Sequence, residues 1–164
     1  MKARISYAQA DSKAVQLLLA VEAHISTSSL EPKLLHLVKM RASQINGCAF
    51  CLDMHSKDAR ADGETEQRLY SLDAWEEAPY YNDRERAALE WTEAVTLLSN
   101  GRVPDSAYER VRAHFSEAEI AALTLAIAMI NSWNRLNVAL RTEAGGYRPG
   151  MFNGLRAQAV EPHG

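Results

Sequence analysis

Apolar residues recur at helical spacing along almost the whole chain, and short polar or glycine-containing stretches separate the apolar segments. In the first segment, Leu18 and Val21 continue an apolar face behind Asp11, a residue suited to an N-cap. No stretch has the sustained period-two alternation of a β-strand. The pattern predicts an all-α, compact bundle of about six to seven helices. The expected helices cover residues 11–25, 32–46, 48–62, 65–77, 82–100, 104–114 and 116–144.

Residues that start and stop helices stand at these boundaries. Pro32 suits a first helical turn, and Ser116 opens a Ser-x-x-Glu capping-box pattern ahead of the last helix. Asn46-Gly47 tolerates the left-handed conformation of many C-caps and ends the second helix. Between residues 120 and 130 the last helix is apolar over most of its circumference. We therefore expect that helix to lie at the centre of the fold or at a subunit interface.

The length of 164 residues suits a single domain over residues 1–164, with a C-terminal tail from about 147 to 164. The formal net charge is -3 and charges of both signs are interspersed, so no basic field favours nucleic acid as a partner. The first residues do not resemble a signal peptide. The longest apolar stretch, residues 118–130, is interrupted by polar side chains and is too short to span a bilayer. We expect a cytoplasmic protein with no membrane partner.

The two cysteines of the chain, Cys48 and Cys51, stand three residues apart. In a reducing cytosol, such a pair is more often catalytic, redox-active or metal-binding than a structural staple. A bridge that closes so short a loop also constrains the unfolded chain little, so its stabilising effect is small. The cysteine pair is therefore the first candidate for chemistry.

A helix that begins just after Gly47 places both cysteines in its first turn, where unpaired backbone N–H groups and the helix dipole favour a thiolate. His55 follows Cys51 by four residues and lies on the same helical face. It can act as a general base toward the Cys51 thiol or hold the thiolate as an ion pair. Cys48 lies one turn earlier, where it can resolve a sulfenic acid at Cys51 into a disulfide.

Two other interpretations of these residues remain open. The cysteines can be buried apolar residues beside an ordinary helix histidine. Alternatively, Cys48, Cys51 and His55 can supply three tetrahedral zinc ligands, with His36 as a fourth. Structural zinc sites usually draw on two separated cysteine pairs, and this sequence has no second pair. The spacing therefore favours thiol redox chemistry over zinc.

The string Asn-Gly-Cys-x-x-Cys-x-x-x-His at residues 46–55 resembles the alkylhydroperoxidase D-like branch of the carboxymuconolactone decarboxylase superfamily. Further segments resemble the peroxidase-related subgroup of that superfamily, and the similarity extends over roughly residues 30 to 140. These further segments are residues 58–60, 68–69, 85–89, 92–96 and 133–136.

The resemblance implies an all-helical, alkylhydroperoxidase D-like fold that assembles into homo-oligomers, either trimers or hexamers, with the cysteine helix beside a subunit interface. It also implies peroxidase and disulfide-reductase activity with no metal, haem or flavin. By position, Cys51 is the peroxidatic thiol, Cys48 the resolving thiol, and His55 the relay that takes the thiol proton. The implied partners are a hydroperoxide substrate and a dithiol or protein reductant, whose identity the sequence does not reveal.

The sequence departs from the resemblance at the residue that completes the relay. Founding members carry a glutamate twelve residues before the first cysteine, where this chain has His36. Glu93, which stands among apolar neighbours, is the first candidate for a replacement carboxylate, and Glu90 is the second. Phe50 replaces a histidine that often precedes the second cysteine, which favours an apolar substrate entrance.

The sequence thus predicts a thiol-dependent alkyl hydroperoxidase-like oxidoreductase. Three alternatives remain. The cysteine pair can carry out dithiol–disulfide exchange without peroxidase turnover. The protein can be a redox sensor whose cysteine pair responds to oxidants. It can also be a carboxymuconolactone decarboxylase-type lyase, whose chemistry needs no cysteine pair.

Overall fold

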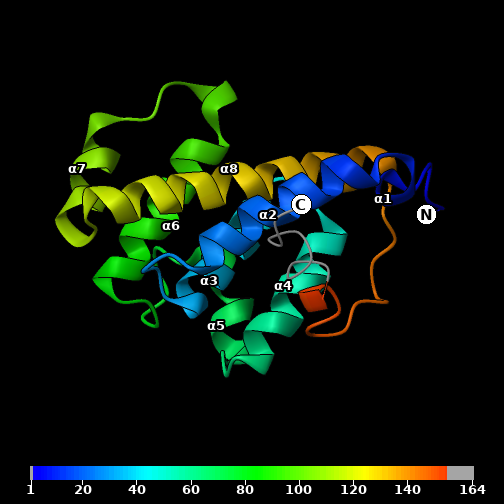
Figure 1. Ribbon diagram of the computed structural model, residues 1–164. Coiled ribbons are helices and arrows are strands. Elements are labelled where there is room, and N and C mark those ends of the chain that lie inside the picture. Colours follow the sequence, from blue (N-terminus) through cyan, green and yellow to red (C-terminus); the bar gives the residue numbers. More distant parts are fainter. Residues whose placement is uncertain (1, 155–164) are drawn as a thin grey trace.

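The computed structural model describes residues 2–154, and every regular element in them is a helix (Figure 1). The predicted all-α fold is therefore confirmed. The α-helices are α1 (Tyr7–Ala10), α2 (Ser12–Ser26), α3 (Pro32–Ile45), α4 (Ala49–Ala61), α5 (Glu66–Tyr70), α6 (Asp83–Thr96), α7 (Asp105–His114) and α8 (Glu117–Leu140). Two 3₁₀ turns are η1 (Leu72–Ala74) and η2 (Leu98–Asn100).

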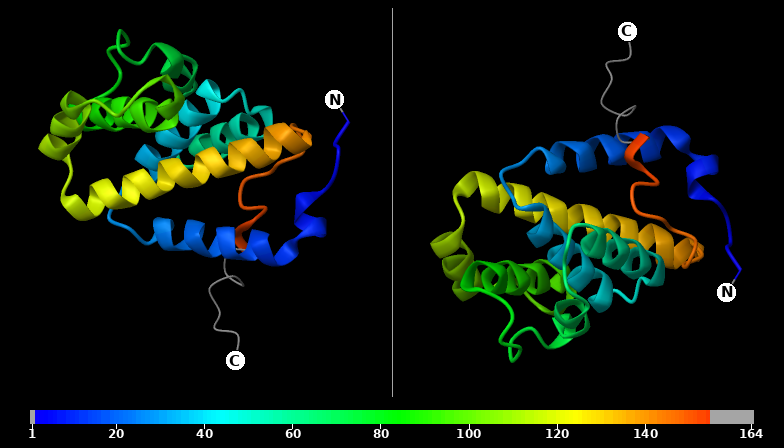
Figure 2. Two further views of the ribbon diagram at one scale, coloured as in Figure 1. Left: turned by 90° about the horizontal axis from the view of Figure 1, so that it is seen from above. Right: turned by 90° about the horizontal axis from the view of Figure 1, so that it is seen from below.

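The core is organised around α3 and α8. Helix α3 packs against α4, α6 and α8, and α8 also packs along α2 (Figures 1 and 2). Val38 faces the core that α3 shares with α6, α7 and α8, whereas Leu37, on an adjacent face, packs in a second cluster with α5 and η1. Ile127 of α8 is completely buried in the first cluster. Helix α3 is therefore buried on two faces, which explains its dense run of apolar residues.

Three of the expected helices end earlier than their sequence patterns indicate. The helix expected over 82–100 stops at Thr96, and its last residues form the separate turn η2. The helix expected over 65–77 stops at Tyr70 and gives way to η1. Beyond η1, the guanidinium of Arg86 binds the carbonyls of Trp75, Glu76 and Ala78, which satisfies them outside any helix. The last helix stops at Leu140 rather than near residue 144. Arg141 there adopts a left-handed backbone with φ 58°, so the helix ends before the two glycines that follow. The short α1 was not predicted.

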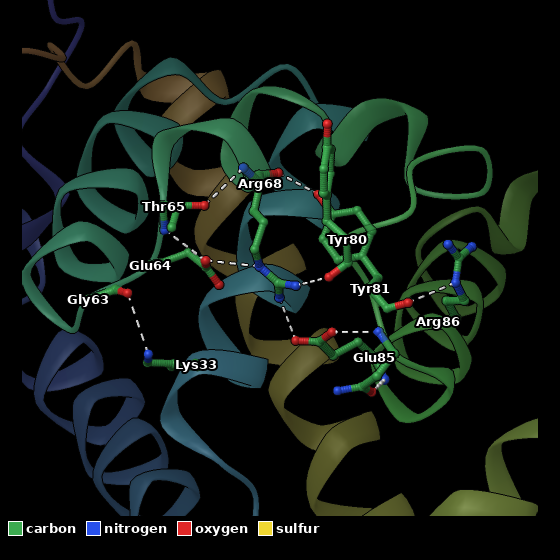
Figure 3. A network of polar contacts seen from close by, with 10 residues as sticks. Lys33, Gly63, Glu64, Thr65, Arg68, Tyr80, Tyr81, Glu85 and Arg86 are labelled. Atoms are coloured by element: carbon green, nitrogen blue, oxygen red, sulfur yellow. Dashed lines mark hydrogen bonds and ion pairs between the residues drawn. The ribbon is translucent and has the colours of Figure 1, made fainter.

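A half-buried arginine, Arg68, fixes the loop between α5 and α6. The guanidinium of Arg68 donates to the carboxylates of Glu64 and Glu85 and to the carbonyl of Tyr80, as Figure 3 shows. Tyr81 donates its hydroxyl proton back to the Arg68 carbonyl. Burial raises the pKa of Tyr81 to about 12, so the hydroxyl remains a donor. This network is structural and holds the 71–82 segment against α3 and α6.

Helix α8 spans 24 residues and is the longest of the described helices. Among the described residues, no single helix is both long enough and apolar enough to cross a bilayer. Helices α7 and α8 pass that test of length and hydropathy only when they are joined across a bend of 120°.

Candidate active site

The turn before α4 is held against α8 by buried amides. Gly47 has φ +64°, the left-handed conformation that the Asn-Gly pair predicts. The Asn46 side chain donates to Asn131 Oδ1 and to Asn134 Oδ1, each at 2.9 Å. Asn134 in turn donates to Ser43 Oγ of α3 at 3.0 Å. This network fixes the point at which α4 begins, and so it fixes the positions of the two cysteines that follow.

Both cysteines occupy the start of α4, as predicted. Cys48 is the N-cap residue, and its sulfur accepts the Cys51 backbone N–H at 3.4 Å. Cys51 is the third residue of the helix, and the two cysteines form a disulfide. Each residue is only 1% exposed. The sulfurs therefore lie within the positive end of the helix dipole, an environment that favours a thiolate once the disulfide is reduced.

Cys51 and His55 share one cavity of about 510 Å³. His55 is buried at 4% exposure, one turn after Cys51 on the same helical face, as their spacing predicts. Most of the wall is apolar, and it includes Phe50, the residue predicted to give an apolar entrance. The other apolar side chains of the wall are Ala3, Ile5, Ala8, Val15, Leu19, Met54, Trp133 and Phe152.

Cys48 lines a different opening, a groove of about 760 Å³. Its wall includes Gly47, Arg141 and Glu143, and it is more polar in composition than the cavity at Cys51. Phe50 and Asn137 lie between the two spaces, because both residues line each of them. Cys51 and Cys48, the two cysteines of one disulfide, therefore line two adjoining but separate openings.

Two residues at Cys51 come from distant parts of the chain. Asn137 of α8 is 4% exposed, and its side-chain Nδ2 donates to Cys51 Sγ at 3.4 Å. Tyr7 of α1 donates its hydroxyl proton to Asn137 Oδ1 at 3.2 Å. Sequence reasoning missed both residues. The signal for Asn137 is its spacing: it follows Asn134 by three residues and so continues the face of the last helix that carries that amide.

A buried acid also reaches this cavity. Glu22 of α2 is 5% exposed and lines the cavity that contains Cys51 and His55. Its carboxylate accepts hydrogen bonds from Lys39 Nζ of α3 and from Trp133 Nε1 of α8, the latter at 3.1 Å. Glu22 was not predicted. Its signal lies in the spacing of Leu19, Glu22 and Ile25, the three buried residues of α2, which put the acid on the apolar face of that helix.

The predicted replacement carboxylates lie elsewhere. Glu93 Oε1 accepts from Arg41 Nε and Trp75 Nε1, both at 2.7 Å, and Glu93 does not line the cavity with Cys51 and His55. Glu90 pairs with Arg110 and is also outside that cavity. Burial raises the pKa of Glu90 above its ordinary value. The acids that line the cavity among the described residues are Glu22 and Glu143, and of these two Glu22 is buried.

The predicted fourth zinc ligand is engaged in an ion pair. His36 Nε2 lies 2.8 Å from Asp62 Oδ2, and its ring centroid is 6.5 Å from that of His55. Within residues 2–154, no group of three His, Cys, Asp or Glu side chains is arranged to hold a metal ion. The geometry of the described residues therefore gives no support to the zinc interpretation.

Residues 13–94, half of the chain, match the sequence model of the carboxymuconolactone decarboxylase family. The chain belongs to this family. It is 45% identical over 144 residues to the uncharacterized protein YdfG of Bacillus subtilis, covering 88% of this chain and 98% of that protein. It is also 32% identical over 119 residues to the uncharacterized protein YnjA of Escherichia coli, across 73% of this chain and 65% of YnjA.

Solved structures confirm the alkylhydroperoxidase D-like fold of this family member. A protein of unknown function from Agrobacterium tumefaciens, described as a candidate antioxidant defence protein AhpD, has a TM-score of 0.86 and 46% identity. The match covers 89% of this chain and all of that one. The debrominase Bmp8 has a TM-score of 0.64 at 18% identity, across 82% of this chain and 68% of its own. At that identity only the fold is shared, and the fold alone does not determine which thiol chemistry it supports.

Proposed function

We propose that this protein is a thiol-dependent hydroperoxidase that reduces apolar organic hydroperoxides through Cys51 and Cys48. The observation that carries the proposal is the position of Cys51 beside His55 on the wall of an apolar cavity, already joined to Cys48 as a disulfide. Membership in the family and the likeness to a candidate antioxidant protein support the same general function.

In the proposed reaction, the Cys51 thiolate attacks the outer oxygen of the hydroperoxide. The S–O bond forms, the O–O bond breaks, and the leaving alkoxide takes a proton from protonated His55 to give an alcohol and a Cys51 sulfenic acid. The Cys48 thiolate then attacks the Cys51 sulfur. An S–S bond forms and hydroxide leaves as water with a proton from the site. One hydroperoxide and two thiols thus yield one alcohol, one water and one disulfide.

An external dithiol returns the enzyme to its reduced form. Its thiolate attacks Cys48 from the groove that contains this sulfur, and Cys51 leaves as a thiolate. Cys51 is the better leaving group of the two, because Asn137 and the first turn of α4 stabilise its negative charge. A second thiol of the reductant then releases Cys48, and the reductant departs as its own disulfide. The scheme uses no metal, haem or flavin.

Separate openings for the two sulfurs also favour a second candidate function. A partner dithiol that enters the groove at Cys48 can exchange with the disulfide without any reaction of Cys51 with peroxide. The protein would then act in dithiol–disulfide exchange or oxidant sensing. For either function we propose a homo-oligomer, a trimer or hexamer, that works in the cytoplasm.

Hydroperoxide consumption with a small dithiol as reductant tests the proposal. The reduced protein is compared with Cys51→Ser, Cys48→Ser and His55→Ala, and with His24→Ala as a control for loss of an exposed helix histidine. We expect cumene hydroperoxide, an apolar substrate, to be consumed faster than hydrogen peroxide. Cys51→Ser should abolish turnover, and His55→Ala should lower it by about 10²- to 10⁴-fold, the usual contribution of acid–base catalysis.

The Cys48→Ser variant assigns the two thiols. It should stop after one turnover and accumulate a sulfenic acid at Cys51 that a dimedone-type reagent captures. A wild-type protein that consumes no hydroperoxide, while its disulfide exchanges rapidly with the dithiol, would overturn the hydroperoxidase in favour of the exchange function. Equal loss in His24→Ala and His55→Ala would remove the relay from the mechanism.

A further inference from the structure

A chain of two hydrogen bonds leads from the protein's first helix to the sulfur of Cys51. Tyr7 donates to Asn137 Oδ1 at 3.2 Å, and Asn137 Nδ2 donates to Cys51 Sγ at 3.4 Å. Tyr7 also packs against the ring of Trp133, with centroids 6.2 Å apart, so its hydroxyl is held at the cavity wall. The scheme proposed above uses Asn137 only when Cys51 leaves the disulfide, and it gives Tyr7 no role.

The direction of this chain follows from the chemistry of the sulfur. A thiolate has no proton and only accepts hydrogen bonds, so the amide must present its N–H₂ group to Cys51. Its oxygen then faces Tyr7, which must be the donor. Burial raises the pKa of Tyr7 above the ordinary value, so the hydroxyl keeps the proton that this role requires.

We propose that Asn137 stabilises the Cys51 thiolate through its side-chain N–H and that Tyr7 is the positioning residue that holds the amide in this orientation. Asn137 contacts the reacting sulfur, so it belongs to the catalytic groups, whereas Tyr7 acts through Asn137. The same donor stabilises Cys51 before it attacks the peroxide and when it leaves the disulfide. The inference rests on the proposed role of Cys51 as the attacking thiolate.

Other titratable groups share the cavity with the Cys51 sulfur, and their effects on its pKa have to be separated from the effect of the amide. Three titratable side chains besides Tyr7 line the cavity in the described residues: Glu22, His55 and Glu143. Glu22 is paired with Lys39, so its charge is largely balanced. A protonated His55 favours the thiolate and Glu143 disfavours it. The amide adds a neutral donor whose contribution does not depend on the protonation of these neighbours.

The test is a pH titration of the Cys51 thiol in a Cys48→Ser background, where Cys51 is the one remaining cysteine. Thiolate ultraviolet absorbance and the rate of alkylation by iodoacetamide both report the pKa. Asn137→Leu, which removes the donor at similar size, should raise the Cys51 pKa by about one unit or more. Tyr7→Phe keeps the ring and should produce a smaller rise.

Thr92→Val serves as the control, because Thr92 is a buried polar residue of α6 whose hydroxyl donates to the Ala88 carbonyl and which lines neither the cavity at Cys51 nor the groove at Cys48. It should leave the Cys51 pKa unchanged. Tyr7→Phe should also lose its effect in the Asn137→Leu background, because Tyr7 acts only through the amide. A merely structural role of Tyr7 would persist there.

Two results overturn the proposal. The first is a folded Asn137→Leu protein whose Cys51 pKa equals that of its parent. The second is a Tyr7→Phe substitution that changes the Cys51 pKa equally with and without Asn137. Tyr7 would then not act through the amide. If Asn137→Leu does not fold, the isosteric Asn137→Asp replaces it. A Cys51 pKa that is unchanged both in Asn137→Asp and in Tyr7→Phe would then overturn the proposal. The titration needs no turnover, so an inactive protein that shows the expected shifts would refute the hydroperoxidase and leave the thiolate stabilisation standing.

Discussion

At the scale of single residues, Glu22 bears on the stability of the fold. Its carboxylate is buried at the cavity that contains Cys51 and His55, and it forms an ion pair with Lys39, which is also buried. Glu22→Gln keeps an acceptor for Trp133 Nε1 but leaves the Lys39 ammonium buried beside a neutral amide. Breaking a buried pair on one side costs about 3–5 kcal/mol. We therefore expect the free energy of unfolding in urea to fall by that amount.

The double variant Glu22→Leu/Lys39→Met is the control for this prediction. Replacing both charges with apolar groups is often neutral or stabilising, since neither charge is then desolvated without a partner. We expect the double variant to be more stable than Glu22→Gln. Equal stability of the parent and Glu22→Gln would show that Lys39 finds water or another partner, and that the pair does not stabilise the fold.

The residues of the site divide by their separation in the sequence. Cys48, Cys51 and His55 were predictable because they are neighbours on one helix, where spacing alone determines which side chains share a face. Tyr7 and Asn137 were not, because they meet Cys51 only through tertiary packing. Long-range polar contacts leave no periodic signal in the sequence, and for the same reason the sequence did not reveal that Glu22, and not Glu93, lines the cavity that contains Cys51 and His55.

At the scale of elements, the start of α4 is defined by the backbone at Gly47. Its φ of +64° is strained for any residue with a Cβ, yet a Cβ built there meets no atom within 4 Å. Gly47→Ala should therefore cost only backbone strain, about 1–2 kcal/mol in the free energy of unfolding. Gly47→Asn should cost less, because asparagine tolerates the left-handed region. A loss in Gly47→Ala well above this range would mean that the turn also resists a side chain sterically.

Helix identities were easier to predict than helix ends. The capping boxes at Asn82 and Ser116 form as the sequence indicates. By contrast, the helix after Thr65 and the last helix end where residues from elsewhere in the chain bind their terminal carbonyls. Tyr81 binds the carbonyl of Arg68 in the first, and Arg4 binds the carbonyls of Ala139 and Leu140 in the second. Local patterns carry capping information, but they do not reveal side chains from elsewhere in the chain that bind the last carbonyls of a helix.

At the scale of the whole molecule, both ends of the described chain help to close the cavity that contains Cys51 and His55. Residues 3 and 5–8 line it together with Thr142, Glu143 and Phe152, and Figure 2 shows the segment after α8 turning back toward α2. The tail expected from residue 147 is described as far as Gly154, and within it Tyr147 is buried and donates to Asp58. This part of the tail is therefore a packed wall of the site. The expected tail residues 155–164 lie outside the described residues.

The pH dependence of this wall follows from Asp53 in α4. Its carboxylate accepts from Lys57 Nζ at 3.0 Å and from the backbone N–H of Gly145 at 3.1 Å, so it fastens the segment after α8 to α4. The hydrogen bond from Lys57, followed by that from Gly145, holds the Asp53 pKa below its ordinary value. A depressed pKa means that Asp53 stabilises the folded wall above the ordinary carboxyl pKa, and that this contribution is lost as the pH falls through the depressed value.

Asp53→Asn should consequently loosen residues 142–152 at neutral pH, since a neutral amide binds Lys57 less strongly than a carboxylate does. We expect backbone amides of that segment to exchange with deuterium several-fold faster than in the parent, after correction for the intrinsic rate at each pH. The difference should shrink on acidification, because protonated Asp53 in the parent then resembles the variant. Asp62→Asn, which loses only the pair with His36, should leave this segment unchanged.

The segment also lines the cavity, so its loosening should weaken substrate binding. The KM for cumene hydroperoxide should rise in Asp53→Asn at neutral pH and approach the parent's value in acid. No difference in exchange between Asp53→Asn and the parent would instead assign the fastening to the Tyr147–Asp58 contact, which both proteins retain.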